Sequence, residues 1–235
     1  MSRVIDVRNL HHRYPDGTEA LQGIDFHFNA GECVALLGAN GSGKTTLVLH
    51  LNGLLQGEGS VEVCGLPVNK STLSQVRAKV GLVFQDSDEQ LFMPTVLEDV
   101  AFGPANLGLT PQQVAARAKQ CLEQVGMIEA LHKAPYHLSA GEKRRVAIAG
   151  VLAMQPEILV LDEPTTFLDP PGQRSLTRLL KDLPQAKLLV THDVSFARAL
   201  ATRAVFLQHG RVAGEGTVDE IVTRFDWHPG FPQST

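Results

Sequence analysis

Two separate segments of this chain carry residue types that bind phosphate groups. The first fits the phosphate-loop pattern G-x-x-x-x-G-K-[ST] and lies between an apolar run, Cys33–Leu37, and a helical pattern over 44–54. Its glycines let backbone amides turn toward an anion, its lysine is expected to reach the terminal phosphates of a nucleotide, and its first threonine supplies a hydroxyl for Mg²⁺. The residues expected to contact the nucleotide here are Gly38, Ala39, Asn40, Gly41, Ser42, Gly43, Lys44, Thr45 and Thr46.

The second segment, residues 138–142, reads Leu-Ser-Ala-Gly-Glu and opens a helical pattern that runs to Met154. Ser139 and Gly141 would present a hydroxyl and free amides to a γ-phosphate, with the positive end of the helix dipole behind them. The spacing Ser139-x-x-Glu142 is also that of a capping box. Both interpretations can hold together, because capping leaves other amides at the helix start free to meet an anion.

Acidic residues and a histidine follow apolar strand patterns. Asp162 and Glu163 come directly after the run 158–161, and His192 follows the run 188–191. Open α/β sheets bind ligands at the carboxyl ends of their strands. We therefore expect Asp162 to hold Mg²⁺ through water and the His192 imidazole to reach the γ-phosphate.

The elements that must position these residues are short β-branched runs alternating with helical patterns, which favours an α/β sheet. Between about 86 and 155 no convincing strand occurs, and this region is predicted to be an inserted helical subdomain with helices over 97–102, 111–125 and 142–154. The capping box Thr110-x-x-Gln113 begins the second of these helices. Strands are predicted over 4–10, 24–28, 33–37, 61–64, 80–84, 158–161, 187–190 and 204–208, and residues 227–235 as a tail without regular structure.

Together with Gln85, Asp169 and His192, these motifs in this order resemble the nucleotide-binding subunit of ATP-binding-cassette (ABC) transporters over nearly the whole chain. The resemblance implies one P-loop NTPase domain over 1–226, with a mixed sheet core, an N-terminal antiparallel β part and the inserted helical subdomain. It implies ATP and Mg²⁺ as ligands, Glu163 polarising the attacking water, and Gln85 sensing Mg²⁺ and that water. Tyr14 is expected to stack on adenine, the alternative being a surface tyrosine.

The same resemblance implies that the 138–142 segment closes on ATP held by another chain, either an identical copy or a paralogue, with Asp169 in the joining loop. The family pattern Leu-Ser-Gly-Gly-Gln differs from this chain at Ala140 and Glu142. The Glu142 carboxylate would weaken binding of the γ-phosphate by this segment unless its side chain points back at the helix start. Slow or tightly gated hydrolysis is therefore expected.

Residues 83–104 resemble the segment after the glutamine loop in energy-coupling-factor importers, particularly cobalt and nickel uptake ATPases. The corresponding segment of vitamin importers of the same class is also similar. This implies a transmembrane coupling subunit, a substrate-binding membrane subunit and a peripheral position on the cytoplasmic face of the membrane. One alternative is a soluble ABC ATPase that acts on ribosomes, nucleic acid or an assembly scaffold. Another is a small-molecule kinase, which would not need the 138–142 segment or Asp169.

Composition adds limits to these interpretations. The 235 residues are 43% hydrophobic, and no apolar stretch approaches the roughly 20 residues that span a bilayer. A net charge of −4 predicts no general affinity for nucleic acid, and the local cluster 143–145 (Lys-Arg-Arg) is interpreted as ordinary helix surface. Three cysteines without Cys-x-x-Cys spacing predict buried thiols, and the histidine pairs 11/12 and 132/137 lack the partners of a closed metal site.

Overall fold

Two sheets form the framework of the structure, a computed structural model that describes residues 2–227. The first is antiparallel with the strand order β2-β1-β4-β5, and the second has the order β10-β9-β3-β8-β7-β6. In the second sheet β6, β7, β8, β3 and β9 run parallel, and β10 is antiparallel to β9. The predicted mixed sheet with an antiparallel N-terminal part is confirmed. The strands are β1 (Arg3–Arg13), β2 (Glu19–Asn29), β3 (Cys33–Leu37), β4 (Glu58–Val63), β5 (Leu66–Pro67), β6 (Val80–Val83), β7 (Ile158–Asp162), β8 (Ala186–Val190), β9 (Arg203–Gln208) and β10 (Arg211–Gly216).

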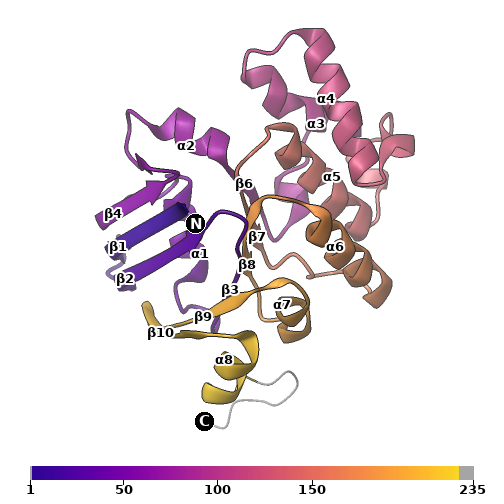
Figure 1. Ribbon diagram of the computed structural model, residues 1–235. Coiled ribbons are helices and arrows are strands. Elements are labelled where there is room, and N and C mark those ends of the chain that lie inside the picture. The colour runs from indigo at the N-terminus through magenta and orange to yellow at the C-terminus, as the bar shows by residue number, and fades with distance from the viewer. Residues whose placement is uncertain (1, 228–235) are drawn as a thin grey trace.

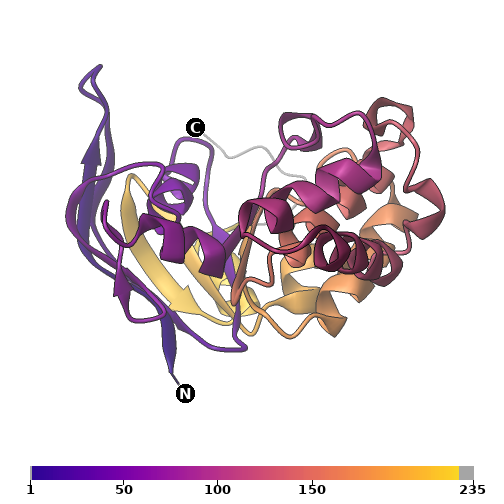
Figure 2. The same ribbon diagram turned by 90° about the horizontal axis from the view of Figure 1, so that it is seen from above.

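Helices α3, α4 and α5 lie together on the side of the six-stranded sheet away from β1, β2 and β4, as both ribbon views show (Figures 1 and 2). The chain between β6 and β7 contains these helices and three 3-10 turns but no strand. Its assignment as an inserted subdomain, and of 1–226 as a single domain, stays a prediction. The helices are α1 (Lys44–Leu51), α2 (Leu73–Lys79), α3 (Val96–Asn106), α4 (Pro111–Gln124), α5 (Ala140–Ala153), α6 (Pro170–Asp182), α7 (Val194–Leu200) and α8 (Val218–Arg224).

Helix α4 illustrates how the sequence specifies a local element. Thr110 and Gln113 form the predicted capping box, and Pro111 occupies the first turn, where its missing N–H costs nothing. On one face Ala118 and Leu122 are fully buried. The α3–α5 cluster therefore has its own apolar core, which continues onto β7.

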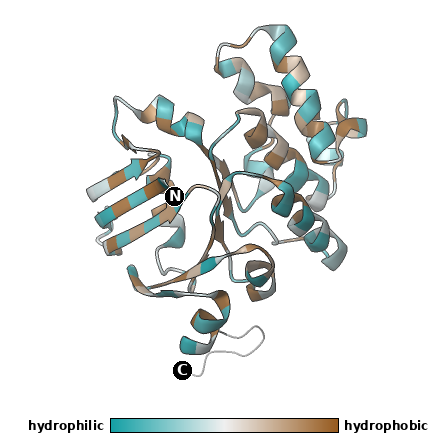
Figure 3. Ribbon diagram, in the orientation of Figure 1, coloured by the Kyte–Doolittle hydropathy of each residue, from teal (hydrophilic) through white to brown (hydrophobic). Residues whose placement is uncertain are grey.

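The central strands carry the site. Every residue of β3, β7 and β8 is buried, and Figure 3 shows apolar residues gathered on these strands. Because the three strands are parallel neighbours, Gly38, Asp162 and Thr191 follow or end them at the same edge of the sheet. Polar residues distant in sequence therefore meet at that edge.

Trp227, the first residue of the predicted tail, packs its ring edge-on against Phe206 with centroids 5.4 Å apart. The rest of that prediction, residues 228–235, lies outside the described residues. No helix within residues 2–227 combines the length and apolarity needed to cross a bilayer.

Candidate functional site

The phosphate loop, residues 38–45, is shaped by its glycines. Gly38 has a φ of 144°, and a Cβ there would lie 2.2 Å from the carbonyl oxygen of Leu207. Gly43 has a φ of 106°, and a Cβ there would lie 2.5 Å from the carbonyl oxygen of Ala20. Gly43 also precedes α1 without any side-chain cap, so the first amides of this helix are free for an anion.

The Lys44 side chain folds back over this loop. Its Nζ donates to the carbonyl oxygens of Gly38 (2.7 Å) and Ala39 (2.9 Å). Burial lowers the pKa of the Lys44 ammonium, and the neighbouring charges of Glu163 and Asp162 oppose that shift. A cation held here by two neutral carbonyls can exchange them for the charged oxygens of a phosphate.

Thr45 and Asp162 provide oxygen ligands on the other side of the loop. The Thr45 hydroxyl donates to Asp162 Oδ2 over 3.4 Å. Burial raises the pKa of the Asp162 carboxyl, with a further contribution from the Glu163 charge. A nearby dication would favour the charged carboxylate, and a hydroxyl with a carboxylate fits Mg²⁺, which takes few protein ligands beside phosphate oxygens and water.

Glu163 and His192 form a hydrogen-bonded pair beside Asp162. Glu163 Oε2 lies 2.8 Å from His192 Nδ1 and accepts the backbone N–H of His192 over 3.3 Å. Glu163 is 8% exposed and adopts a left-handed backbone (φ 43°), whereas the His192 side chain is 67% exposed. A buried carboxylate aimed by an imidazole at the cleft mouth suits a general base for water.

A cleft of about 280 Å³ brings many of these residues together. Asn40, Gly41, Gly43, Lys44, Thr45, Thr46, Asp162 and Glu163 line it, together with Tyr14 and Gln85. The Tyr14 hydroxyl lies 3.1 Å from Thr46 Oγ1, which anchors the ring at one end of the cleft. Sequence reasoning missed Thr18, Glu19 and Ala20, which also line the cleft; the pairing of Arg13 with Glu19 between β1 and β2 places them there.

Arg144 is a further residue whose part in the site was not predicted from the sequence. Its guanidinium donates to the carbonyl oxygens of Phe84 and of Gln85, the latter over 2.6 Å. The residue is only 3% exposed, so its interpretation as helix surface is wrong. Burial lowers the pKa of Arg144, while Asp86 and Asp162 act against that shift. This cation ties the start of α5 to the glutamine loop (Phe84–Asp88), and Lys143 adds an ion pair to Asp88 at 2.6 Å.

The 138–142 segment forms the capping box that the sequence predicts. Ser139 N and Ser139 Oγ both donate to Glu142 Oε2 at 2.8 Å, and Glu142 N donates to Ser139 Oγ over 3.4 Å. These bonds from Ser139 lower the pKa of the Glu142 carboxyl. Glu142 therefore points back at the helix start. Ser139 and Gly141 do not line the 280 Å³ cleft of their own chain.

Asp169 also lies outside this cleft. It caps α6 by accepting the N–H of Gly172 over 2.8 Å. The loop before it, residues 163–168, approaches the 138–142 segment: a Cβ at Gly141 would lie 3.7 Å from Leu168 Cδ2. Within one chain the residues thus fall into two groups, one around the cleft and one around the start of α5.

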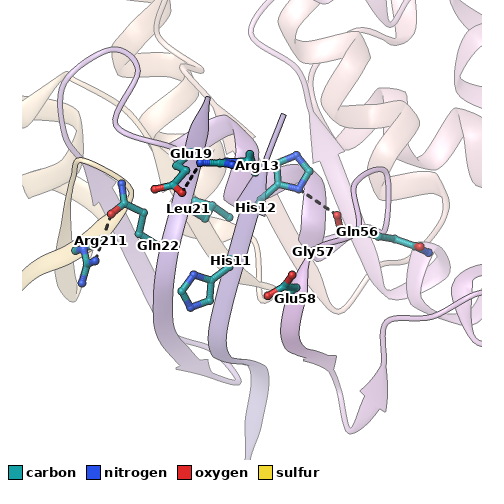
Figure 4. Close-up of a pocket in the computed structure, with 10 residues that line it drawn as sticks. All are labelled: His11, His12, Arg13, Glu19, Leu21, Gln22, Gln56, Gly57, Glu58 and Arg211. Carbon is teal, nitrogen blue, oxygen red and sulfur yellow. Dashed lines mark hydrogen bonds and ion pairs between the residues drawn. The ribbon is translucent and has the colours of Figure 1, made fainter. Parts of the chain in front are cut away.

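A larger pocket of about 670 Å³ lies on β1, β2 and β4 and is a poor phosphate site (Figure 4). Arg13 is paired with Glu19 at 2.9 Å, and His12 Nδ1 lies 3.1 Å from the carbonyl oxygen of Gln56. It has no glycine-rich loop before a helix. Among residues 2–227, no three His, Cys, Asp or Glu side chains gather as a metal site. The three cysteines are free, and burial raises the pKa of Cys33 to about 12.

The fold and the cleft together define a P-loop nucleotide hydrolase: a glycine loop between β3 and α1, an acid pair at the end of β7, and a histidine after β8. Comparisons with known proteins make this class more specific. A family profile described as "ABC transporter" matches residues 21–166.

A putative ABC transporter ATP-binding protein of Streptomyces avermitilis is 55% identical over 219 residues, covering 93% of this chain and 84% of the relative. The energy-coupling factor transporter ATP-binding protein EcfA of Methanosphaera stadtmanae is 48% identical over 229 residues, covering 95% and 82%. The chain belongs to the ABC transporter family and is an ATP hydrolase of that type.

Solved structures agree with this assignment. CbiO1 from Clostridium perfringens, described as part of the ABC transporter complex cbiONQ, has a TM-score of 0.86 at 36% identity, covering 96% of this chain and 93% of that one. The cassette MJ0796, a dimer in a post-hydrolysis state bound to ADP and Pi, has a TM-score of 0.81 at 29% identity, covering 91% and 98%.

Proposed function

We propose that this chain is the ATP-hydrolysing subunit of an energy-coupling-factor importer and that it works as a head-to-tail pair, with an identical chain or a paralogue. The separation of the two phosphate-binding groups carries the proposal. Most of the phosphate loop lines the cleft with Asp162 and Glu163, but Gly38, Ala39 and Ser42 of the loop do not, and neither do Ser139 and Gly141. A second chain must then supply them to complete the site, and the dimeric relative MJ0796 supports such pairing.

The residues that line the cleft, together with His192 beside Glu163, divide the chemistry among them. Lys44 and the amides of the loop bind and orient the phosphates, and Tyr14 stacks on the adenine. Thr45, Asp162 and Gln85 would hold Mg²⁺, which neutralises charge on the phosphate oxygens when bound. Glu163 accepts the proton of the attacking water, and His192 fixes the Glu163 carboxylate in position and reaches the γ-phosphate.

Dimer formation is tested with a variant that binds ATP but cannot hydrolyse it. Glu163→Gln keeps the shape of the side chain but removes the base, so ATP with Mg²⁺ should hold the variant as a dimer in sedimentation velocity. Lys44→Ala in the same background is the matched control, because it loses phosphate binding and should stay monomeric. A Glu163→Gln variant that remains monomeric with saturating ATP and Mg²⁺ would reject the proposal.

The membrane partner is proposed to dock on a groove of about 210 Å³ between β6, α3 and α5. Phe92 and Phe102 are 64% and 43% exposed there, with ring centroids 5.1 Å apart. Asp99 Oδ1 accepts the amides of Phe92 and Met93 at 3.0 Å, while its buried Oδ2 has no partner among the described residues. An apolar rim around one unsatisfied carboxylate oxygen fits a helix that brings a polar or cationic side chain.

The transported substrate is proposed to be a transition-metal ion, cobalt or nickel, or a vitamin, and the ATPase would not touch it. Residues 83–104 support this substrate class, and the relative named as an energy-coupling factor transporter ATP-binding protein supports the importer type. The subunit would then lie on the cytoplasmic face of the membrane.

Co-purification tests the docking groove. Tagged protein purified from detergent-solubilised membranes should carry a multi-span membrane protein with it. The Phe92→Asp variant should not retain that partner, while its ATP-dependent pairing persists.

Uptake assays complete this test. Cells that lack the chain should recover uptake of labelled cobalt, nickel or a vitamin with the wild type but not with Glu163→Gln, which identifies the substrate. Recovery of ribosomes or nucleic acid in place of a membrane partner would overturn the import proposal and favour a soluble ABC ATPase.

A further inference from the structure

Two histidine rings form a chain of contacts that ends on Tyr14. The rings of His12 and Tyr14 are nearly perpendicular, with centroids 4.7 Å apart, and the rings of His12 and His50 are steeply inclined, with centroids 4.8 Å apart. Tyr14 lines the nucleotide cleft, whereas neither histidine does. The two imidazoles therefore stand behind a residue of the cleft without lining it themselves.

Hydrogen bonds close this chain of ring contacts into a circuit. His50 Nδ1 lies 2.7 Å from the carbonyl oxygen of Thr46, and Thr46 Oγ1 lies 3.1 Å from the Tyr14 hydroxyl. His12 Nδ1 lies 3.1 Å from the carbonyl oxygen of Gln56, as Figure 4 shows. His12 belongs to β1, and Thr46 and His50 belong to α1, the helix that follows the phosphate loop. The circuit thus joins the residue proposed to contact the base to the helix whose start is proposed to bind the phosphates.

The buried nitrogens of these rings set them apart from ordinary core residues. In each ring Nδ1 faces a carbonyl oxygen and carries the hydrogen, which leaves Nε2 of the neutral ring as an acceptor. His12 Nε2 and His50 Nε2 are both buried, and neither has a partner in hydrogen-bonding geometry among the described residues. Unsatisfied buried polar atoms cost stability that an apolar side chain avoids. Packing alone therefore gives no reason for imidazoles at these two positions.

The His50 imidazole is held as the neutral form. The residue is only 2% exposed. Burial lowers its pKa, the Thr46 carbonyl opposes that shift, and the nearby His12 adds to it. A neutral ring is free to pack edge to face against another ring, as His50 does against His12.

We infer that His12 and His50 are positioning residues for the base of the nucleotide, and that they act by holding the Tyr14 ring in the orientation that stacks on adenine. The inference rests on the proposed stacking of Tyr14. A tyrosine side chain can rotate about two bonds, and stacking needs one of its orientations. His12 packs against the Tyr14 ring and Thr46 bonds to its hydroxyl, so less freedom is lost when the base binds. His50 supports both contacts, because it touches His12 and Thr46.

ADP and inorganic pyrophosphate test this inference together, by displacement of a fluorescent ADP analogue from the wild type and its variants. ADP carries the base without the γ-phosphate, so hydrolysis does not contribute, and pyrophosphate carries no base. His12→Asn keeps an N–H for the Gln56 carbonyl and removes the ring. It should weaken ADP binding about twofold to tenfold and leave pyrophosphate binding unchanged. His12→Phe keeps a ring and should bind ADP like the wild type.

His50→Leu separates positioning from a structural role. It removes a buried unpaired nitrogen, so the melting temperature should stay the same or rise, while ADP binding weakens about twofold to tenfold and pyrophosphate binding does not. His11→Asn is the matched control. His11 precedes His12 in β1, and its Nε2 lies 3.1 Å from Asn9 Oδ1. It should leave both affinities unchanged.

Tyr14→Ala distinguishes failure of this inference from failure of the proposed stacking. It should weaken ADP binding relative to pyrophosphate binding, and His12→Asn added to it should have no further effect. If Tyr14→Ala binds ADP like the wild type, the stacking is wrong and the inference falls with it. If Tyr14→Ala weakens ADP binding but His12→Asn and His50→Leu do not, or if they weaken ADP and pyrophosphate binding equally, the inference is wrong while the stacking stands.

Discussion

Glu142 is one of the two residues, with Ala140, at which the 138–142 segment differs from the family pattern. Its replacement is predicted to strengthen pairing while lowering the stability of the fold. In the capping box, the Ser139 hydroxyl hydrogen is donated to the Glu142 carboxylate at 2.8 Å. Ser139 must give up that bond before its hydroxyl can donate to a γ-phosphate on a partner chain. The carboxylate also opposes the approaching phosphate by charge.

The size of the effect follows from the bonds. A hydrogen bond to a charged group contributes about 1.5–3 kcal/mol and a neutral one about 0.5–1.5 kcal/mol, so glutamine lowers the cost of releasing each serine by about 1 kcal/mol. A pair contains two such serines, which gives about 2 kcal/mol and a roughly 30-fold tighter dimer for Glu142→Gln. The same substitution weakens the cap of α5 by about 0.5–1 kcal/mol, so the melting temperature should fall by a few degrees.

Sedimentation velocity in the Glu163→Gln background measures the dimer dissociation constant, and ATPase assays with Glu163 intact should show faster turnover. Glu220→Gln is the matched control, since Glu220 accepts Thr217 N over 2.7 Å in the equivalent box of α8. It should lower the melting temperature comparably without tightening the dimer. Pairing by Glu142→Gln that is equal to or weaker than the parent would refute the reasoning.

The pH dependence has a defined sign. Bonds from Ser139 lower the pKa of Glu142, so its contribution to stability is present above the unfolded pKa and is lost only as pH falls through the lower folded value. Between pH 6 and 8 the carboxylate stays charged. The dimer dissociation constants of the parent and of the Glu142→Gln variant should therefore keep a constant ratio over that pH range.

Substitutions at three further sites, with their controls, test other parts of the structure. Gly38→Ala places a Cβ 2.2 Å from a backbone oxygen and should cost about 3 kcal/mol or more by thermal unfolding, whereas Gly17→Ala, with φ 90° and no atom within 4 Å, should cost only about 1 kcal/mol. Arg144→Met should lower kcat about tenfold with ATP affinity unchanged, and Arg144→Lys should recover part of the loss; equal defects in both variants would argue for a purely structural role. Because burial raises the pKa of Asp99, its charged form destabilises the fold above that pKa and the cost disappears as pH falls below it. Asp99→Asn should thus keep or raise the melting temperature at pH 7 while weakening capture of the membrane partner, and a lower melting temperature would contradict this.

The sequence predicted the elements whose signal is local. The β-branched runs of β3, β7 and β8 are each fully buried strands, so their apolar patterns were continuous and easy to place. The predicted strand 4–10 extends to Arg13 in the structure, because antiparallel pairing to Glu19 continues through polar residues. The predictions did not include α6, although Leu176 and Leu180 bury one face of it.

The candidate site divides in the same way. The phosphate loop and the acid pair were readable because their chemistry requires particular residues at fixed spacing. The role of Arg144 could not be predicted from the sequence, because its burial depends on the carbonyls of Phe84 and Gln85. These residues lie far from Arg144 in the sequence and meet α5 only in the folded chain. Its neighbour Arg145 is only half-buried, and the sequence offers no way to tell the two arginines apart.

The Arg144 guanidinium has a consequence for the order of events in a pair. Gln85 borders the nucleotide of its own subunit, whereas the start of α5 would serve the nucleotide of the neighbour, and one side chain joins the two. If loss of one γ-phosphate moved Gln85 in the proposed pair, Arg144 would pass that movement to the helix that contacts the opposite ATP. Two identical subunits would then hydrolyse their ATP one after the other rather than simultaneously. The first hydrolysis would break the two-fold symmetry of the pair.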